Sequence, residues 1–114
     1  MHTYQERAMI CRIWRGWTTA QNADRYEAIV RGQVIPEIEA MRIDGFQHID
    51  LLRKSGKHEV EFTTIMWFDD IAAVRRFAGA DYEAAHVPAF ARAVLTRFDE
   101  RSAHYDVLDR RPQA

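Results

Sequence analysis

The stretch FQHIDLLRKSGKHEVEFTTIMWF, residues 46–68, decides the fold of this chain. Its two apolar runs, 46–54 and 59–68, flank Ser55-Gly56-Lys57, a short glycine-containing turn of the kind that closes β-hairpins. In the second run, one set of side chains alternates with another, as happens in a strand because successive residues point to opposite faces. The first set is Val60, Phe62, Thr64, Met66 and Phe68, and the second is Glu59, Glu61, Thr63, Ile65 and Trp67. We therefore predict a β-hairpin here.

A strand and a long helix are expected before the hairpin. Residues 9–17 are rich in apolar and aromatic side chains and predict a strand, and residues 20–41 then change to a helical period. Pro36 lies inside this helical stretch, where it removes a backbone donor and crowds the carbonyl of Gly32. A kink or short break is expected over residues 32–36.

Two helices and a last strand are expected after the hairpin. Asp69 or Asp70 can cap a short helix that ends at Gly79, and Pro88 suits the first turn of a second helix reaching about Phe98. Residues 103–108 predict the last strand. The order strand, helix, strand, strand, helices, strand predicts an α+β fold, a ferredoxin-like βαββαβ unit with helices packed on one face of an antiparallel sheet.

Length and composition indicate one small domain. The chain has 114 residues, of which 47% are hydrophobic and 29% charged, and its formal net charge is -1. Such a balance gives no general attraction to nucleic acid or to an anionic membrane surface. We expect a domain over residues 8–108, a flexible N-terminus at 1–7 and a flexible tail at 109–114. Residues 1–7 lack the apolar run of a signal peptide and no run is long enough to span a bilayer, so a cytoplasmic location is expected.

Both faces of the predicted sheet carry apolar side chains. Cys11 and Ile13 share one side of the first strand, but Ile10 and Trp14 lie on the other. Helices can cover only one face, and a sheet face exposed to solvent would be more polar. Burial of the second face against another copy of the chain resolves this, so a homodimer is expected.

Four stretches resemble the antibiotic biosynthesis monooxygenase-like proteins. They are ICRIWRGWT at 10–18, EVEFTTIMWFD at 59–69, DYEAAHVP at 81–88 and RFDERSAHY at 97–105. The resemblance covers roughly residues 8–108 and implies a dimeric α+β barrel, in which two ferredoxin-like units pair their sheets. Some members of this family oxygenate polycyclic aromatic compounds without metal or flavin, and others degrade haem.

Trp67 and His86 form the first candidate site. In the haem-degrading branch of the superfamily, the resemblance implies a His that binds iron, a Trp against the porphyrin and an Asn on the first strand. The matching first-strand position here is near Ile13, and that strand contains no Asn. The alternative is structural, with Trp67 in the core and His86 at the start of a helix.

A second candidate set joins His48 and Asp50 with Arg12, His104 and Asp106. An imidazole beside a carboxylate can serve as a general base, and removal of a proton from a phenol or enol leaves an anion that can reduce O2 directly. The alternative is an ion-pair network between two subunits. No metal site is predicted, because His48 and His104 lack a third ligand.

Aromatic side chains could also wall a pocket for a flat ligand, and Trp14, Tyr82 and Phe90 are candidate binding residues beside Arg12 and His104. The alternative is that they form the hydrophobic core.

Three functions follow from these patterns. The first is a monooxygenase that needs no cofactor and acts on a small aromatic, phenol- or quinol-like compound, with His86 or His48 as the base and Trp67 in the pocket wall. The second is a haem-binding or haem-degrading protein that uses His86. The third is a non-catalytic dimer that binds a small ligand.

Overall fold

The protein, represented by a computed structural model, is described over residues 9–114, and the predicted flexible segment 1–7 lies outside this range. Its strands are β1 (Ile10–Thr18), β2 (Phe46–Ser55), β3 (Val60–Phe68), β4 (Arg97–Phe98) and β5 (Ala103–Asp106). Its α-helices are α1 (Ala23–Ile29), α2 (Ile35–Ala40), α3 (Ile71–Ala78) and α4 (Ala89–Arg92). A π-helical turn, Val30–Val34, joins α1 to α2.

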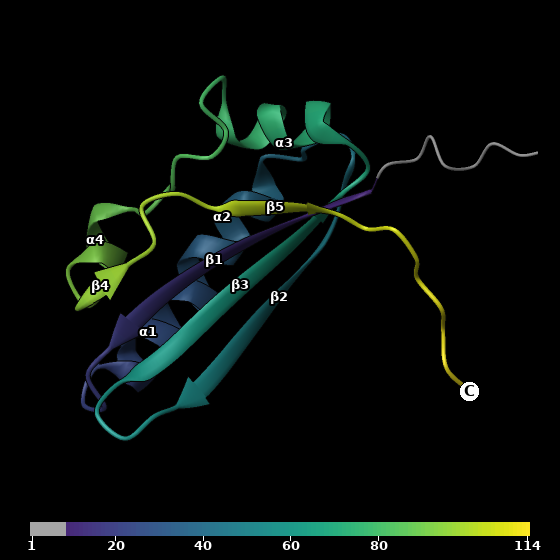
Figure 1. The fold of residues 1–114 in the computed structure, drawn as a ribbon. Coiled ribbons are helices and arrows are strands. Elements are labelled where there is room, and N and C mark those ends of the chain that lie inside the picture. The colour runs from purple at the N-terminus through teal and green to yellow at the C-terminus, as the bar shows by residue number, and fades with distance from the viewer. Residues whose placement is uncertain (1–8) are drawn as a thin grey trace, which may run out of the picture.

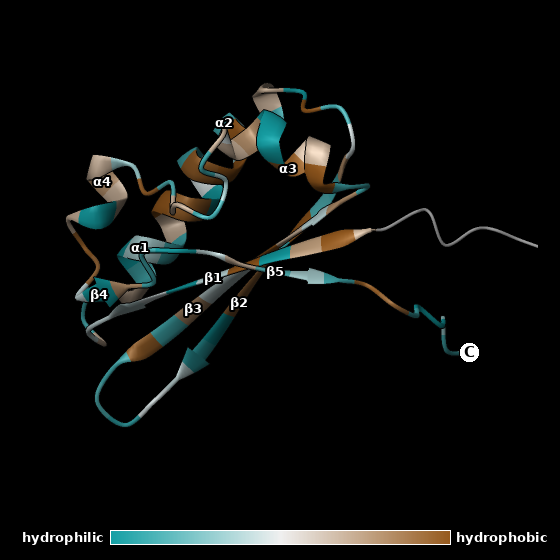
Figure 2. Cartoon of the chain, turned by 45° about the horizontal axis from the view of Figure 1, so that its top comes forward, coloured by the Kyte–Doolittle hydropathy of each residue, from teal (hydrophilic) through white to brown (hydrophobic). Residues whose placement is uncertain are grey.

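The strands form one antiparallel sheet in the order β2-β3-β1-β4, with β5 also paired to β1. The helices lie together on one face of this sheet (Figures 1 and 2). The predicted ferredoxin-like α+β unit is therefore confirmed.

The core lies between the helices and this sheet face, as the alternation in β3 predicted. Val60, Phe62, Met66 and Phe68 are buried, whereas the residues between them are only partly buried. Phe62 is fully buried and packs against Tyr26 of α1 with a ring-centroid distance of 4.8 Å. The first set of alternating residues is thus the helix-facing set.

The long helix is distorted near the predicted place but does not break. In the π-helical turn, the N–H of Ile35 bonds the carbonyl of Val30, five residues back. Pro36 then falls in the first turn of α2, where a missing N–H costs no helical hydrogen bond. The distortion occupies residues 30–34, slightly before the expected 32–36.

The helix predicted after Pro88 is much shorter than expected. It ends at Arg92, and Arg97–Phe98 pair instead with Gly16 and Trp17 of β1. Ala91 and Val94 are the buried residues of this segment, and Phe90 is 41% exposed, so the alternative that places Phe90 in the hydrophobic core is wrong. The free edge of β1 offers backbone hydrogen bonds that a longer helix would leave unmade.

The opposite sheet face, which we call the open face, carries no helix (Figures 1 and 2). Register places Ile13, Ile65 and Trp67 on it, together with Leu52 at 48% and Tyr105 at 56% exposure. The open face therefore carries apolar side chains, as the sequence predicted. Within residues 9–114, no helix is long and apolar enough to cross a membrane.

Candidate ligand cavity between the sheet and the helices

An apolar cavity of about 60 Å³ lies between the helix-facing side of the sheet and the helices. Apart from a tryptophan and a tyrosine, four of its lining residues have polar side chains: Arg12, Thr64, His86 and Ser102. The rest are aliphatic or aromatic. Such a wall, with few polar groups, is typical of sites for small organic molecules.

The cavity continues outward into a wider groove of about 540 Å³. Six residues line both spaces, among them Phe77, His86 and Pro88, and the groove adds Glu37 and Met41 at its rim. An enclosed cavity of about 150 Å³ is known to hold a benzene ring. An aromatic ligand would therefore occupy the cavity only in part and extend into the groove.

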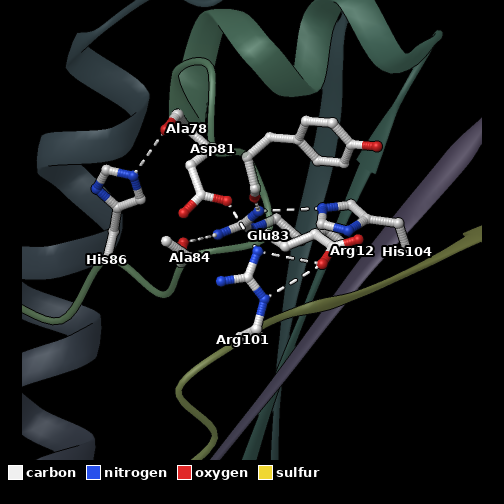
Figure 3. Close-up of polar contacts among 9 residues, drawn as sticks. Arg12, Ala78, Asp81, Glu83, Ala84, His86, Arg101 and His104 are labelled. Carbon is white, nitrogen blue, oxygen red and sulfur yellow. Dashed lines mark hydrogen bonds and ion pairs between the residues drawn. The ribbon is translucent and has the colours of Figure 1, made fainter.

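His86 is exposed at the junction of cavity and groove. Its Nε2 lies 3.1 Å from the carbonyl oxygen of Ala78, which can only accept, so Nε2 carries the proton and Nδ1 keeps its lone pair (Figure 3). Ala78 is the last residue of α3, and Gly79, with a φ of 88°, ends that helix. The imidazole is thereby oriented by the backbone, with one nitrogen available to take a proton.

Arg12 reaches the cavity from β1 and is only 4% exposed. Its Nη1 donates to the carbonyl of Tyr82 and to Nε2 of His104 at 3.0 Å, and its Nη2 donates to the carbonyl of Ala84 at 3.2 Å (Figure 3). These contacts tie β1 and β5 to the loop that leads to His86.

The charge of Arg12 has no carboxylate partner among residues 9–114 within ion-pair distance. The acidic residues of the adjacent loop, Asp81 and Glu83, pair with Arg101 instead, at 2.8 and 3.2 Å. Burial lowers the pKa of Arg12 to about 10. The guanidinium stays protonated near neutral pH, so the cavity contains a cation without an anion.

His104 is held as a neutral acceptor. Because a guanidinium can only donate, Nε2 of His104 must accept from Arg12, which leaves the proton on Nδ1. Burial, followed by the positive charge of Arg12, lowers the pKa of His104. The lone pair of Nε2 is therefore engaged, and His104 serves to position Arg12.

Trp67 and His86 do not share a site within one chain. Trp67 pairs with Cys11 and His48 on the open face, whereas His86 lines the cavity on the helix-facing side. The expected joint pocket is wrong, because in a strand a residue next to the buried Met66 must point to the other face. The indole of Trp67 instead donates to Asp50 at 3.0 Å.

The second candidate set is also divided between the two faces. His48 lies 3.9 Å from Asp50 and 5.4 Å, ring to ring, from Trp67 on the open face. Arg12 and His104 lie on the helix-facing side. The expectation of one cluster is therefore wrong.

The three predicted aromatic residues have different positions. Trp14 lines the cavity, and its indole N–H donates to the carbonyl of Asp99 at 2.7 Å. Tyr82 packs edge-on against His104 at 5.1 Å, behind the wall. Phe90 is outside the cavity lining.

Ser102 was missed by sequence reasoning, although it lines the cavity and is 5% exposed. Its hydroxyl has no hydrogen-bond partner in the described part of the chain. The only available signal was its position two residues before His104, which places both on one side of a strand. Over residues 9–114, no group of three or more His, Cys, Asp or Glu is arranged to hold a metal ion.

Comparison with solved structures places this architecture in a known class. No family model and no curated protein sequence matches the chain. A proposed antibiotic biosynthesis monooxygenase from Bacillus cereus is similar, with a TM-score of 0.64 and 14% identity over 93% of this chain and 99% of the other. SnoaB, a cofactor-independent oxygenase from Streptomyces nogalater, gives a TM-score of 0.57 and 19% identity over 93% and 99%. The monooxygenase of the ActVA-Orf6 gene of Streptomyces coelicolor, solved with nanaomycin D, gives a TM-score of 0.63 and 11% identity over 96% of each chain.

The chain is thus a ferredoxin-like α+β protein. More specifically, it has the fold of the antibiotic biosynthesis monooxygenase-like proteins, which confirms at the level of fold the resemblance in its sequence.

Proposed function

We propose that the protein is a cofactor-independent monooxygenase that oxidises a small phenol- or quinol-like aromatic compound in the helix-side cavity. The observation that carries this proposal is His86, whose Nδ1 is left free at the junction of the apolar cavity and the groove by the bond from Nε2 to Ala78. The oxygenases among the similar structures support the reaction class.

The first step is removal of a proton by His86. The phenolic hydroxyl of an anthrol-like substrate gives its proton to Nδ1, and the negative charge spreads over the ring to a carbon atom. A backbone carbonyl partner for Nε2–H stabilises the imidazolium that forms, as in other histidine bases oriented by a hydrogen bond.

The anion then supplies the electrons for oxygen reduction. Its carbon bonds to O2, and the proton from His86 returns to give a hydroperoxide at that carbon. Loss of water breaks the O–O bond together with the remaining C–H bond and leaves a carbonyl. One oxygen atom enters the product, the other leaves as water, and the substrate provides both electron pairs. The apolar wall limits competing proton transfer to the anion.

We also propose that two chains pair through their open faces. Ile13 and Ile65 are direct cross-strand neighbours at the centre of this face, and the partly buried Trp67 lies two residues further along β3. Pairing would remove these apolar side chains from water. The same face also carries charged residues: Asp50 lies directly opposite Ile65, and Arg15 and Lys54 lie nearer the hairpin turn.

Oxygen uptake tests the proposed reaction. Protein treated with a chelator and shown by its spectrum to be free of flavin is mixed with anthrone in an oxygen electrode, against the uncatalysed background. We expect His86→Ala to lose the protein-dependent uptake, since general bases typically contribute 10²–10⁴-fold. His48→Ala, which changes an imidazole on the other face of the sheet, is the matched control and should retain it.

Haem titration separates the proposal from the haem-binding alternative. We expect no shift of the Soret band with the wild-type protein. A shift that saturates at one haem per chain and disappears in His86→Ala would contradict the proposal and assign His86 to iron.

A further inference from the structure

Two buried polar side chains are part of the cavity wall. Arg12 and Ser102 both line it, with exposures of 4% and 5%. The hydroxyl of Ser102 has no partner within residues 9–114. A buried hydroxyl normally has a partner, because desolvation without a hydrogen bond is costly. The cavity wall therefore contains a polar group that a ligand could satisfy.

The partners of Arg12 leave its charge and part of its donor capacity free. All three are uncharged, namely two backbone carbonyls and the imidazole of His104. They account for three of the five N–H groups of a guanidinium. A neutral donor could hold the same carbonyls without the cost of burying a charge. An anion in the cavity would offset that cost.

We infer that Arg12 and Ser102 form an anion subsite that selects aromatic ligands carrying an ionised oxygen group, either a phenolate or a carboxylate. This deepens the proposed function by naming the substrate class of the same cavity, and it rests on that proposal for the reaction. The ionised oxygens accept hydrogen bonds from the guanidinium and from the Ser102 hydroxyl. Charge-assisted bonds of this kind are stronger than neutral ones.

Phe77 connects this subsite to His86. The guanidinium carbon of Arg12 lies 5.3 Å from the centre of the Phe77 ring, and the imidazole of His86 lies 5.6 Å from it on centroids. Phe77 also lines both the cavity and the groove. A ring that holds its ionised oxygen at Arg12 would therefore extend along Phe77 towards the groove and present a second, still protonated hydroxyl to His86, as the quinol-like substrates of the proposed reaction can.

Ligand binding to the wild-type protein tests the inference without any turnover. Under anaerobic conditions, 2-naphthoate and 2-naphthalenemethanol are titrated by fluorescence at neutral pH, because they share one ring system and differ in charge. We expect the carboxylate to bind at least about tenfold more tightly. Equal affinities, or tighter binding of the alcohol, would exclude carboxylates, and together with an unshifted titration of the phenol probe described next they would overturn the inference.

A coloured probe separates the two sources of the anion. 4-Nitrophenol turns yellow on ionisation, and a subsite for phenolates should shift its titration to lower pH when protein is in excess. A shift assigns phenolates to the subsite. Selectivity for naphthoate without this shift restricts the subsite to carboxylates, and the absence of both effects overturns it.

Substitutions test whether Arg12 and Ser102 are the source of the selectivity for the anion. Arg12→Met should abolish the selectivity for the anion and Arg12→Lys should retain part of it, with circular dichroism as the check on folding. Ser102→Ala, a smaller change, should weaken naphthoate binding by about threefold or more and leave the alcohol unaffected. Arg97→Gln removes an exposed guanidinium that pairs with Glu59 outside the cavity, and should change neither.

Should Arg12→Met fail to fold, the wild-type comparison and Ser102→Ala still decide the question. The outcome is also independent of catalysis. Anion selectivity without oxygen uptake would retain the subsite and remove the proposed reaction, whereas uptake without selectivity would do the reverse.

Discussion

Dimerisation through the open face can be tested by placing a charge at its centre. Ile65 is partly buried in β3, directly opposite Ile13 in β1 and Asp50 in β2. In a twofold-symmetric dimer each substitution counts twice. Full burial of an isoleucine stabilises by roughly 1.5–3 kcal/mol.

The protomer already supplies part of this burial, so about half of it is left for the interface. The two copies of Ile65 then contribute roughly 1.5–3 kcal/mol, which corresponds to about 10–150-fold in the dimer dissociation constant. Ile65→Asp adds two carboxylates beside the two copies of Asp50, which increases the loss further.

Sedimentation equilibrium over two decades of protein concentration measures this constant. Phe90→Asp is the matched control, because it places the same charge on an exposed aromatic residue of the helix side. We expect wild type and Phe90→Asp to be dimers and Ile65→Asp to dissociate with an unchanged circular dichroism spectrum. A monomeric wild type, or a dimer indifferent to Ile65→Asp, would refute this reasoning.

Three further predictions concern stability. Phe62→Ala should lower the free energy of unfolding by about 3–5 kcal/mol because Phe62 is fully buried, whereas Phe90→Ala, at a position 41% exposed, should cost under about 1 kcal/mol; urea denaturation measures both. Gly32→Ala should raise the melting temperature, because a Cβ there meets nothing within 4 Å and alanine favours the helix. Gly45→Ala should lower the melting temperature, because the φ of Gly45 is +90° and a Cβ would lie 2.8 Å from a side chain of α3. The pKa of His104 lies below its ordinary value of 6.5, so on acidification the unfolded chain takes up this proton before the folded chain does. The free energy of unfolding should therefore fall as the pH falls below about 6.5. His104→Asn should weaken this pH dependence in melting curves recorded across that range.

Local patterns were sufficient to predict the features that depend on local structure. The alternation in β3 predicted its buried face, and Asp70 caps α3 as expected by accepting from the backbone N–H of Ala73 at 2.9 Å. Gly79 ends the same helix. In each case, neighbours in the sequence supply the interaction.

Features that depend on distant pairing could not be predicted in this way. A one-residue change of register moves every side chain of a strand to the other face, and the pairing of β2 with β3 shifts register between Phe46 and His48. The position of His48 beside Trp67 on the open face follows from that pairing. The short α4 results from pairing of Arg97–Phe98 with β1, which no local propensity reports.

Arg12 illustrates both cases. Its side of β1 could be read from the alternation with Ile10 and Trp14, but the loop carbonyls that hold it lie about 70 residues further along the chain. That no carboxylate among residues 9–114 pairs with it is visible only in the folded chain.

We propose that oxygen from O2 enters an aromatic substrate at the cavity that His86 borders. The most direct measurement is mass spectrometry of the product formed from anthrone under ¹⁸O₂, with protein free of metal and flavin and with His86→Ala in parallel. We expect a single labelled oxygen atom in the product, formed at a rate that falls to the uncatalysed background in the variant. An unlabelled product, or labelling at the same rate with His86→Ala, would contradict it.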